Sequence, residues 1–117
     1  MRTIRRYIED QVPTIVCLCG STRFQQTFIN ANRDETIKGN IVLSVGMFGH
    51  QEGLDMNGEL KQRLDELHKR KIDLCDEVLV LNAGGYVGES TASEVEYAKE
   101  IGKPIRWLEM TNHESEP

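Results

Sequence analysis

Short apolar segments alternate with longer amphipathic ones along most of the chain. The segment Thr14–Cys19 (TIVCLC) is almost continuously apolar, which is typical of a strand buried on both faces. In the next segment Phe24, Phe28 and Ala31 recur at helical spacing, and a Gly-Asn pair marks the end of the predicted helix. The alternation continues, with strands expected at Ile41–Val45, Glu77–Asn82 and Ile105–Leu108 and helices over Leu60–Leu74 and Ala92–Ile101.

The helix expected between the second and third strands has leucines on one side and charged residues on the other. Leu60, Leu64, Leu67 and Leu74 are expected to face the sheet. Oppositely charged residues four positions apart support the solvent side of this helix. His68 is expected on the surface.

Strand–helix alternation with short connections predicts an α/β fold. We expect a parallel sheet of four or five strands covered by helices on both faces, a Rossmann-like three-layer sandwich. The whole chain, 1–117, is expected to form one domain, with an N-terminal arm over 1–12 and a polar tail over 109–117. Ligands of such sheets bind outside the carboxyl ends of the strands. This rule brings three loops to one crevice: Gly20–Arg23, Gly46–Gly58 and Ala83–Glu94.

Composition narrows the range of partners. The 117 residues include 14 Lys+Arg and 19 Asp+Glu, for a formal net charge of −5, whereas a nucleic-acid binder needs a clustered basic face. No run approaches the roughly 18 apolar residues of a membrane span. The N-terminus lacks the apolar core of a secretory signal. We therefore expect a cytoplasmic protein that binds neither nucleic acid nor membrane.

The three cysteines are expected to be reduced thiols, because no secretion signal accompanies them. Cys17 and Cys19 alternate within the first strand and should share one of its faces, while Cys75 lies far along the chain. No CxxC or HxxxH spacing links cysteines and histidines. The sequence therefore predicts no metal site, and it indicates no cofactor.

The turn Gly20-Ser21-Thr22-Arg23 directly follows the first strand and is expected to open a helix. A helix N-terminus offers unpaired N–H groups and a positive dipole end, and Arg23 adds a bidentate charge, so the turn suits an anion. Ser21 as a simple helix cap explains the turn equally well. The pattern matches neither GxxxxGK[ST] nor GxGxxG, which disfavours a P-loop NTPase or a standard dinucleotide site.

A second segment with candidate chemistry is Gly84–Glu94. Its three glycines allow a ligand to approach the backbone closely, and Ser90 or Thr91 can cap the next helix. Glu94 is then expected in the first helical turn, where the helix dipole stabilises its ionised form. A capping box alone would explain the same pattern.

Asp73 and Asp76 lie around the end of the long helix, just before the third strand. Either could point into the crevice as a proton donor or a contact for a base. Exposed turn-forming residues are the alternative interpretation.

In their order and spacing, four segments together resemble the nucleoside 2-deoxyribosyltransferase-like family. They are CGSTRF, DxxDEVLVLN, GxSTxxEVxYA and GKPI. Within the family, the small 2′-deoxynucleoside 5′-phosphate N-hydrolases and uncharacterised phage and bacterial relatives are most similar. The resemblance implies a flavodoxin-like sheet, cleavage or transfer at the N-glycosidic bond of a nucleoside or its 5′-monophosphate, and a homodimer.

The resemblance also implies roles for individual residues. Glu94, in the pattern ExxxA, matches the catalytic glutamate, and Asp73 is the candidate for the acid that protonates the leaving base. Substrate-binding positions are expected on both loops, with a 5′-phosphate at the first loop and Ser90 as the candidate for a serine that the hydrolases use: Gly20, Ser21, Arg23, Gly88 and Ser90. Gly88 occupies the position at which the transferases have an aspartate.

Two alternative functions remain open from the sequence. One is a nucleotide-binding module that keeps the anion-binding turn and has no catalytic activity. The other is a phosphoribohydrolase of the lysine-decarboxylase-like type, whose GGxGTxxE signature resembles Gly84–Glu94 loosely.

Overall fold

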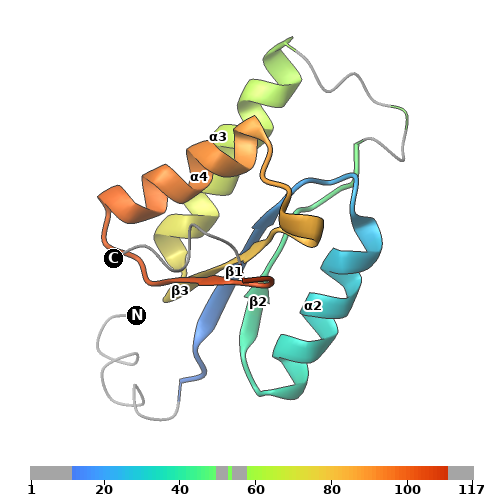
Figure 1. Cartoon of the computed structure of the whole chain (residues 1–117). Coiled ribbons are helices and arrows are strands. Elements are labelled where there is room, and N and C mark those ends of the chain that lie inside the picture. The colour runs from blue at the N-terminus through green and yellow to red at the C-terminus, as the bar shows by residue number, and fades with distance from the viewer. Residues whose placement is uncertain (1–11, 50–52, 54–57, 111–117) are drawn as a thin grey trace.

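The computed structural model describes residues 12–49, 53 and 58–110 of the chain. In this part, four strands form one parallel sheet in the order β2-β1-β3-β4 (Figure 1). The prediction of a parallel α/β sheet is confirmed, with small shifts at the strand ends. The bounds are Ile15–Gly20 for β1, Ile41–Leu43 for β2, Glu77–Leu81 for β3 and Ile105–Trp107 for β4.

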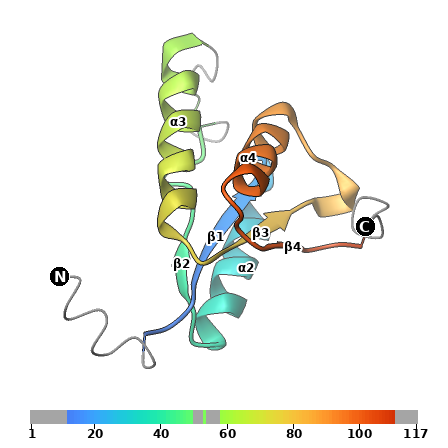
Figure 2. The same cartoon turned by 90° about the vertical axis from the view of Figure 1, so that its left-hand side faces the viewer.

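Helices cover both faces of this sheet, as the alternation along the sequence predicts. One helix, α2, packs on one face, while α3 and α4 lie together on the other (Figures 1 and 2). This layering and strand order are those of a flavodoxin-like three-layer fold. The helices span Gln25–Ile37 (α2), Gly58–Leu74 (α3) and Glu89–Glu100 (α4), with a short 3₁₀ turn at Ala83–Gly85 (η2).

None of the helices in the described residues has the length and apolar character needed to cross a membrane.

Alternate residues of the central strands contribute to two separate hydrophobic clusters. Cys17 and Cys19 lie in the cluster under α3 and α4, whereas Val16 and Leu18 lie in the cluster under α2. This confirms the prediction that the two cysteines share one face of β1. The first cluster also contains Ile72, Cys75, Val78, Val80, Val95 and Ala98, and the second contains Phe28, Ala31, Leu79 and Leu81.

The buried side of α3 differs from the prediction. His68 and Ile72 are buried, while Leu67 and Leu74 are 54% and 67% exposed. Neighbouring residues of a helix are turned by about 100°, so residues four apart share a side, and half-buried Leu64 continues the stripe of His68 and Ile72. Leu60, also half-buried, lies on this side too, so the leucine pattern fails only at Leu67 and Leu74. The expectation that His68 lies on the surface is wrong, because His68 belongs to the buried stripe.

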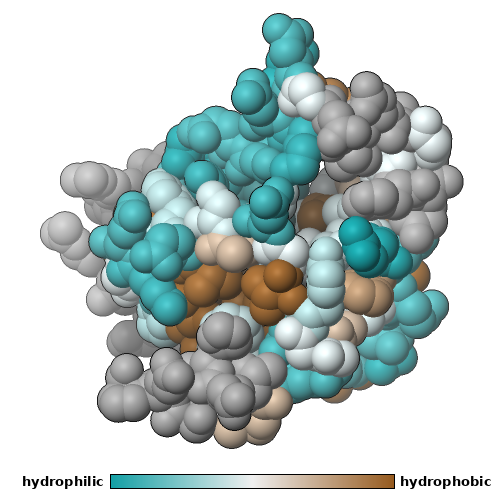
Figure 3. All heavy atoms as spheres, turned by 45° about the horizontal axis from the view of Figure 1, so that its top comes forward, coloured by the Kyte–Doolittle hydropathy of each residue, from teal (hydrophilic) through white to brown (hydrophobic). Residues whose placement is uncertain are grey.

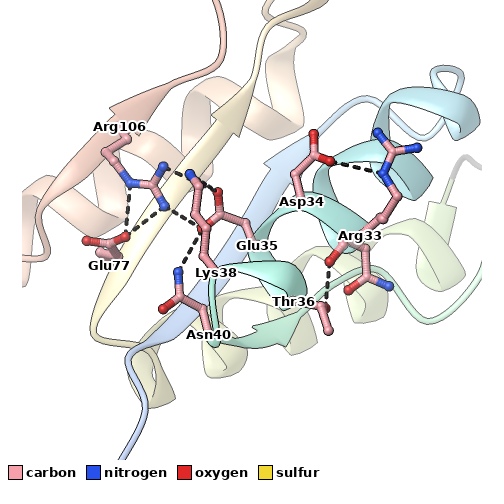
Figure 4. A network of polar contacts seen from close by, with 9 residues as sticks. Arg33, Asp34, Glu35, Thr36, Lys38, Asn40, Glu77 and Arg106 are labelled. Carbon is pink, nitrogen blue, oxygen red and sulfur yellow. Dashed lines mark hydrogen bonds and ion pairs between the residues drawn. The ribbon is translucent and has the colours of Figure 1, made fainter.

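On the other face of the sheet, a network of ion pairs connects α2 with β3 and β4 (Figure 4). The side chain of Glu35 is only 3% exposed, and its carboxylate accepts hydrogen bonds from Arg106 at 2.9 Å, Asn40 at 2.9 Å and Lys38 at 3.1 Å. Arg106 also pairs with Glu77 at 2.8 Å. Burial by itself raises the pKa of Glu35, but these hydrogen bonds outweigh it and lower the pKa to about 2.

Candidate functional site

A cavity of about 820 Å³ lies at the carboxyl end of β1, bordered by α3 and α4. The loops after β1, β2 and β3 all contribute to its lining, as predicted for a parallel sheet. In the space-filling view, hydrophobic residues (brown) come to the surface near the centre of the face shown, with hydrophilic residues (teal) above and to the left of them (Figure 3). All of the predicted site residues except Asp73 line the cavity: Gly20, Ser21, Arg23, Gly88, Ser90 and Glu94.

Asp73 lies outside the cavity, so the expectation that it points into the crevice is wrong. It follows buried Ile72 by one position, which turns its side chain to the exposed side of α3. There its carboxylate accepts hydrogen bonds from the Tyr97 hydroxyl and from Arg70, and these lower the pKa of Asp73. Asp73 therefore connects α3 with α4 at the protein surface through its hydrogen bonds.

The turn at Gly20–Arg23 precedes α2 and does not cap it. The backbone N–H of Phe24 donates to the Ser21 carbonyl, and α2 begins only at Gln25, without a side-chain cap. The guanidinium of Arg23 lies over the ring of Tyr86, 5.0 Å from its centroid. The Arg23 charge is thus held beside the cavity by an aromatic ring from the loop after β3.

At the two glycines of the predicted site, Gly20 and Gly88, a side chain would lie very close to neighbouring atoms. A Cβ at Gly20 would lie 3.0 Å from the Cβ and 3.1 Å from the carbonyl oxygen of Leu81. A Cβ at Gly88 would lie 3.1 Å from the Tyr86 hydroxyl. Close approach of β1 to β3, and of the loop to Tyr86, therefore accounts for both without a ligand.

The start of α4 differs from both interpretations of the Ser/Thr-x-x-Glu pattern. Gly88 is the N-cap residue and makes no side-chain cap, so neither Ser90 nor Thr91 caps the helix. The helix begins at Glu89, which places Glu94 in the second turn. The effect of the helix dipole falls off within the first turn, so the expected stabilisation of the ionised form by the dipole is wrong.

Glu94 instead lies in a largely desolvated environment at the inner wall of the cavity. Its side chain is buried, with 7% exposure, and burial raises its pKa to about 7. The positive charge of His68 partly offsets this effect, while negative charge on Asp65 and Cys17 reinforces it. Near neutral pH both protonation states of Glu94 are therefore populated.

A polar group of α3 and α4 brings the carboxylate of Asp65 to the cavity. The ammonium of Lys61 donates to Asp65 at 2.8 Å and to the Ser90 hydroxyl at 2.6 Å, and that hydroxyl lies 3.3 Å from Asp65. All three residues line the cavity. In the sequence, Lys61 and Asp65 look like any surface ion pair at i,i+4, and only the contact with α4 distinguishes them.

Beside Glu94, two thiols and an imidazole come together in the core. The Cys17 Sγ lies 3.6 Å from His68 Nε2, which also contacts the Leu18 carbonyl oxygen at 2.9 Å. The hydrogen bond from the Cys19 thiol and the contact with His68 outweigh burial and lower the pKa of Cys17 to about 5. Burial lowers the pKa of His68, but its contacts with Cys17 and the charge of Glu94 raise it more. Sequence reasoning missed this group because His68 follows Cys17 by 51 positions.

Neither a scan against models of protein families nor a search of curated proteins found a match for this chain.

Proposed function

We propose that the protein cleaves the N-glycosidic bond of a nucleoside 5′-monophosphate, with Glu94 as the carboxylate at the anomeric carbon. One observation carries the proposal: a buried carboxylate lines the same cavity as a glycine-serine turn with an arginine. The volume of about 820 Å³ falls within the range of small-molecule sites. The resemblance of the CGSTRF and ExxxA segments to the deoxyribosyltransferase-like family leads to the same reaction.

The substrate can be oriented by its two ends. The phosphate binds at Gly20–Arg23, where backbone N–H groups and the guanidinium of Arg23 supply donors. Asp65 accepts hydrogen bonds from the sugar hydroxyls, and the Ser90 hydroxyl donates to them. The binding energy of the phosphate then serves to hold the anomeric carbon near Glu94.

The chemical step requires the ionised form of Glu94. As the bond between the anomeric carbon and the base nitrogen breaks, its electron pair leaves with the base and positive charge develops on the sugar. A Glu94 oxygen forms a bond to the anomeric carbon, and water or a second base then replaces it, giving hydrolysis or transfer. Protonation of the leaving base comes from a cavity group or from water.

We further propose that the protein acts in the cytoplasm as a homodimer. Its three cysteines are free thiols, which suits a reducing compartment. A second copy placed over the cavity would exclude water from the reacting atoms.

The test is to incubate the protein with nucleosides and with their 5′-monophosphates and to measure free base by chromatography. The proposal predicts base release, faster from the 5′-monophosphates. Nucleotide binding without any release of base would instead support the alternative of a non-catalytic nucleotide-binding module.

A further inference from the structure

The thiols of Cys17 and Cys19 and the imidazole of His68 form a group with the dimensions of a metal site. One donor atom from each residue lies within 4.8 Å of the others, and all three residues are buried. A tetrahedral zinc ion, with Zn–S of about 2.3 Å and Zn–N of about 2.0 Å, separates a sulfur from a nitrogen by about 3.5 Å. The distance of 3.6 Å between Cys17 Sγ and His68 Nε2 meets this requirement.

We propose that Cys17, Cys19 and His68 bind one Zn²⁺ ion, with a water molecule as the fourth ligand. The inference rests on the arrangement of the donor atoms and does not depend on the proposed function. Sulfur and imidazole donors favour zinc over magnesium or calcium, which prefer oxygen.

The donor group adjoins the cavity through His68. His68 and Glu94 both line the cavity, and the two cysteines lie behind them at 0% exposure. An ion entering from the cavity would therefore meet the imidazole of His68 first and the two sulfurs next.

Binding changes the protonation of each ligand. Zn²⁺ takes the place of the proton on the Cys19 thiol and of any proton on Cys17, and these protons are released to solvent. His68 binds through Nε2 only when its remaining proton is on Nδ1, so the hydrogen bond from Nε2 to the Leu18 carbonyl is given up.

Cys75 provides the matched comparison. It is also a buried free cysteine of the same hydrophobic cluster, but its thiol donates to the Ile72 carbonyl, and it is not part of the donor group. A thiol that only fills space in the core would behave like Cys75. Replacing Cys17 or Cys19 should therefore abolish metal binding, and replacing Cys75 should preserve it.

The experiment titrates the reduced full-length protein with Co²⁺, which reports thiolate ligands through sulfur-to-cobalt charge-transfer absorption and tetrahedral geometry through its visible bands. We expect one equivalent of Co²⁺ with both signatures, displaced by one equivalent of Zn²⁺. The Cys75→Ser variant should match the parent. Cys17→Ser and Cys19→Ser should weaken binding by more than about a hundredfold, beyond the usual effect of losing an outer-shell partner.

Circular dichroism establishes that each variant is folded, and His68→Gln replaces any cysteine variant that is not. The absence of charge-transfer absorption in the parent would overturn the inference. So would bands that persist in Cys19→Ser or His68→Gln, because the ion would then bind elsewhere. The absorption spectrum measures metal binding without any assay of activity. A protein that binds no metal therefore says nothing against the glycosidase proposal, and a protein that releases no base says nothing against the metal proposal.

Discussion

Replacing Glu35 by glutamine should destabilise the protein in a pH-dependent manner. The carboxylate is 3% exposed and accepts hydrogen bonds from Arg106, Asn40 and Lys38, which lower its pKa from 4.5 to about 2. At about 1.4 kcal/mol for each pKa unit, this corresponds to about 3 kcal/mol of folding free energy at neutral pH. Glutamine keeps the size of the side chain but loses the charge.

The sign of the pH dependence follows from the lowered pKa. The stabilisation is fully present above the pKa of the unfolded chain, near 4.5, and is lost as the pH falls toward about 2. Other carboxylates also contribute to acid unfolding, so the informative quantity is the difference in unfolding free energy between parent and Glu35→Gln. Urea unfolding should give a difference of about 3 kcal/mol at pH 7 that shrinks steadily below pH 4.5.

A matched control lies next to Glu35 on the same helix. Asp34 pairs with Arg33 at 3.0 Å, but the two side chains are 56% and 61% exposed, so Asp34→Asn should cost less than about 1 kcal/mol. A difference between parent and Glu35→Gln that stays constant from pH 7 to pH 2 would refute the reasoning, as would an equal effect of the two substitutions.

Three further predictions concern the cavity, the sheet and the assembly. Arg23→Ala should weaken binding of a nucleoside 5′-monophosphate by about 1.5–3 kcal/mol in calorimetry and leave the nucleoside almost unaffected, whereas equal losses would make Arg23 structural. Gly20→Ala should lower the free energy of unfolding by about 1–3 kcal/mol, because the new Cβ would lie 3.0 Å from the Cβ of Leu81. Gly46→Ala should leave the free energy of unfolding unchanged, because no atom lies within 4 Å of its new Cβ, and equal effects of the two substitutions would contradict this explanation. Sedimentation velocity should show a dimer, and a monomer that retains activity at high concentration would remove the idea that a second copy closes the cavity.

The fold was predictable because its signals are local. Two apolar segments form buried strands, the run before Gly20 and the stretch Glu77–Leu81. Gly39 and Gly102 each follow the end of a helix, as predicted. The position of the cavity followed from a general rule about parallel sheets. Most of the predicted site residues line the cavity because they follow the carboxyl ends of strands. The carboxyl ends of parallel strands lie at the same edge of the sheet, so the order of the elements in the sequence is enough to place these residues.

The parts that failed depend on contacts between distant segments. The side of α3 that faces the sheet is set by packing against β1 and α4, and it exposes Asp73 and buries His68. The residues around His68 in α3 do not indicate that its imidazole contacts Cys17 of β1. The sequence predicted the wrong start for α4 because the Ser/Thr-x-x-Glu pattern resembles a helix cap, whereas the actual N-cap residue, Gly88, has no side chain that would indicate one.

Base release from a nucleoside 5′-monophosphate by parent, Glu94→Gln and Glu96→Gln proteins decides whether Glu94 is the catalytic carboxylate. Glu94 is buried and lines the cavity, whereas Glu96 is exposed on the same helix. Both variants should fold and bind nucleotide normally. Release should fall at least about a hundredfold in Glu94→Gln alone, which corresponds to roughly 2.7 kcal/mol of transition-state stabilisation. Release by Glu94→Gln at the parent rate would contradict this assignment.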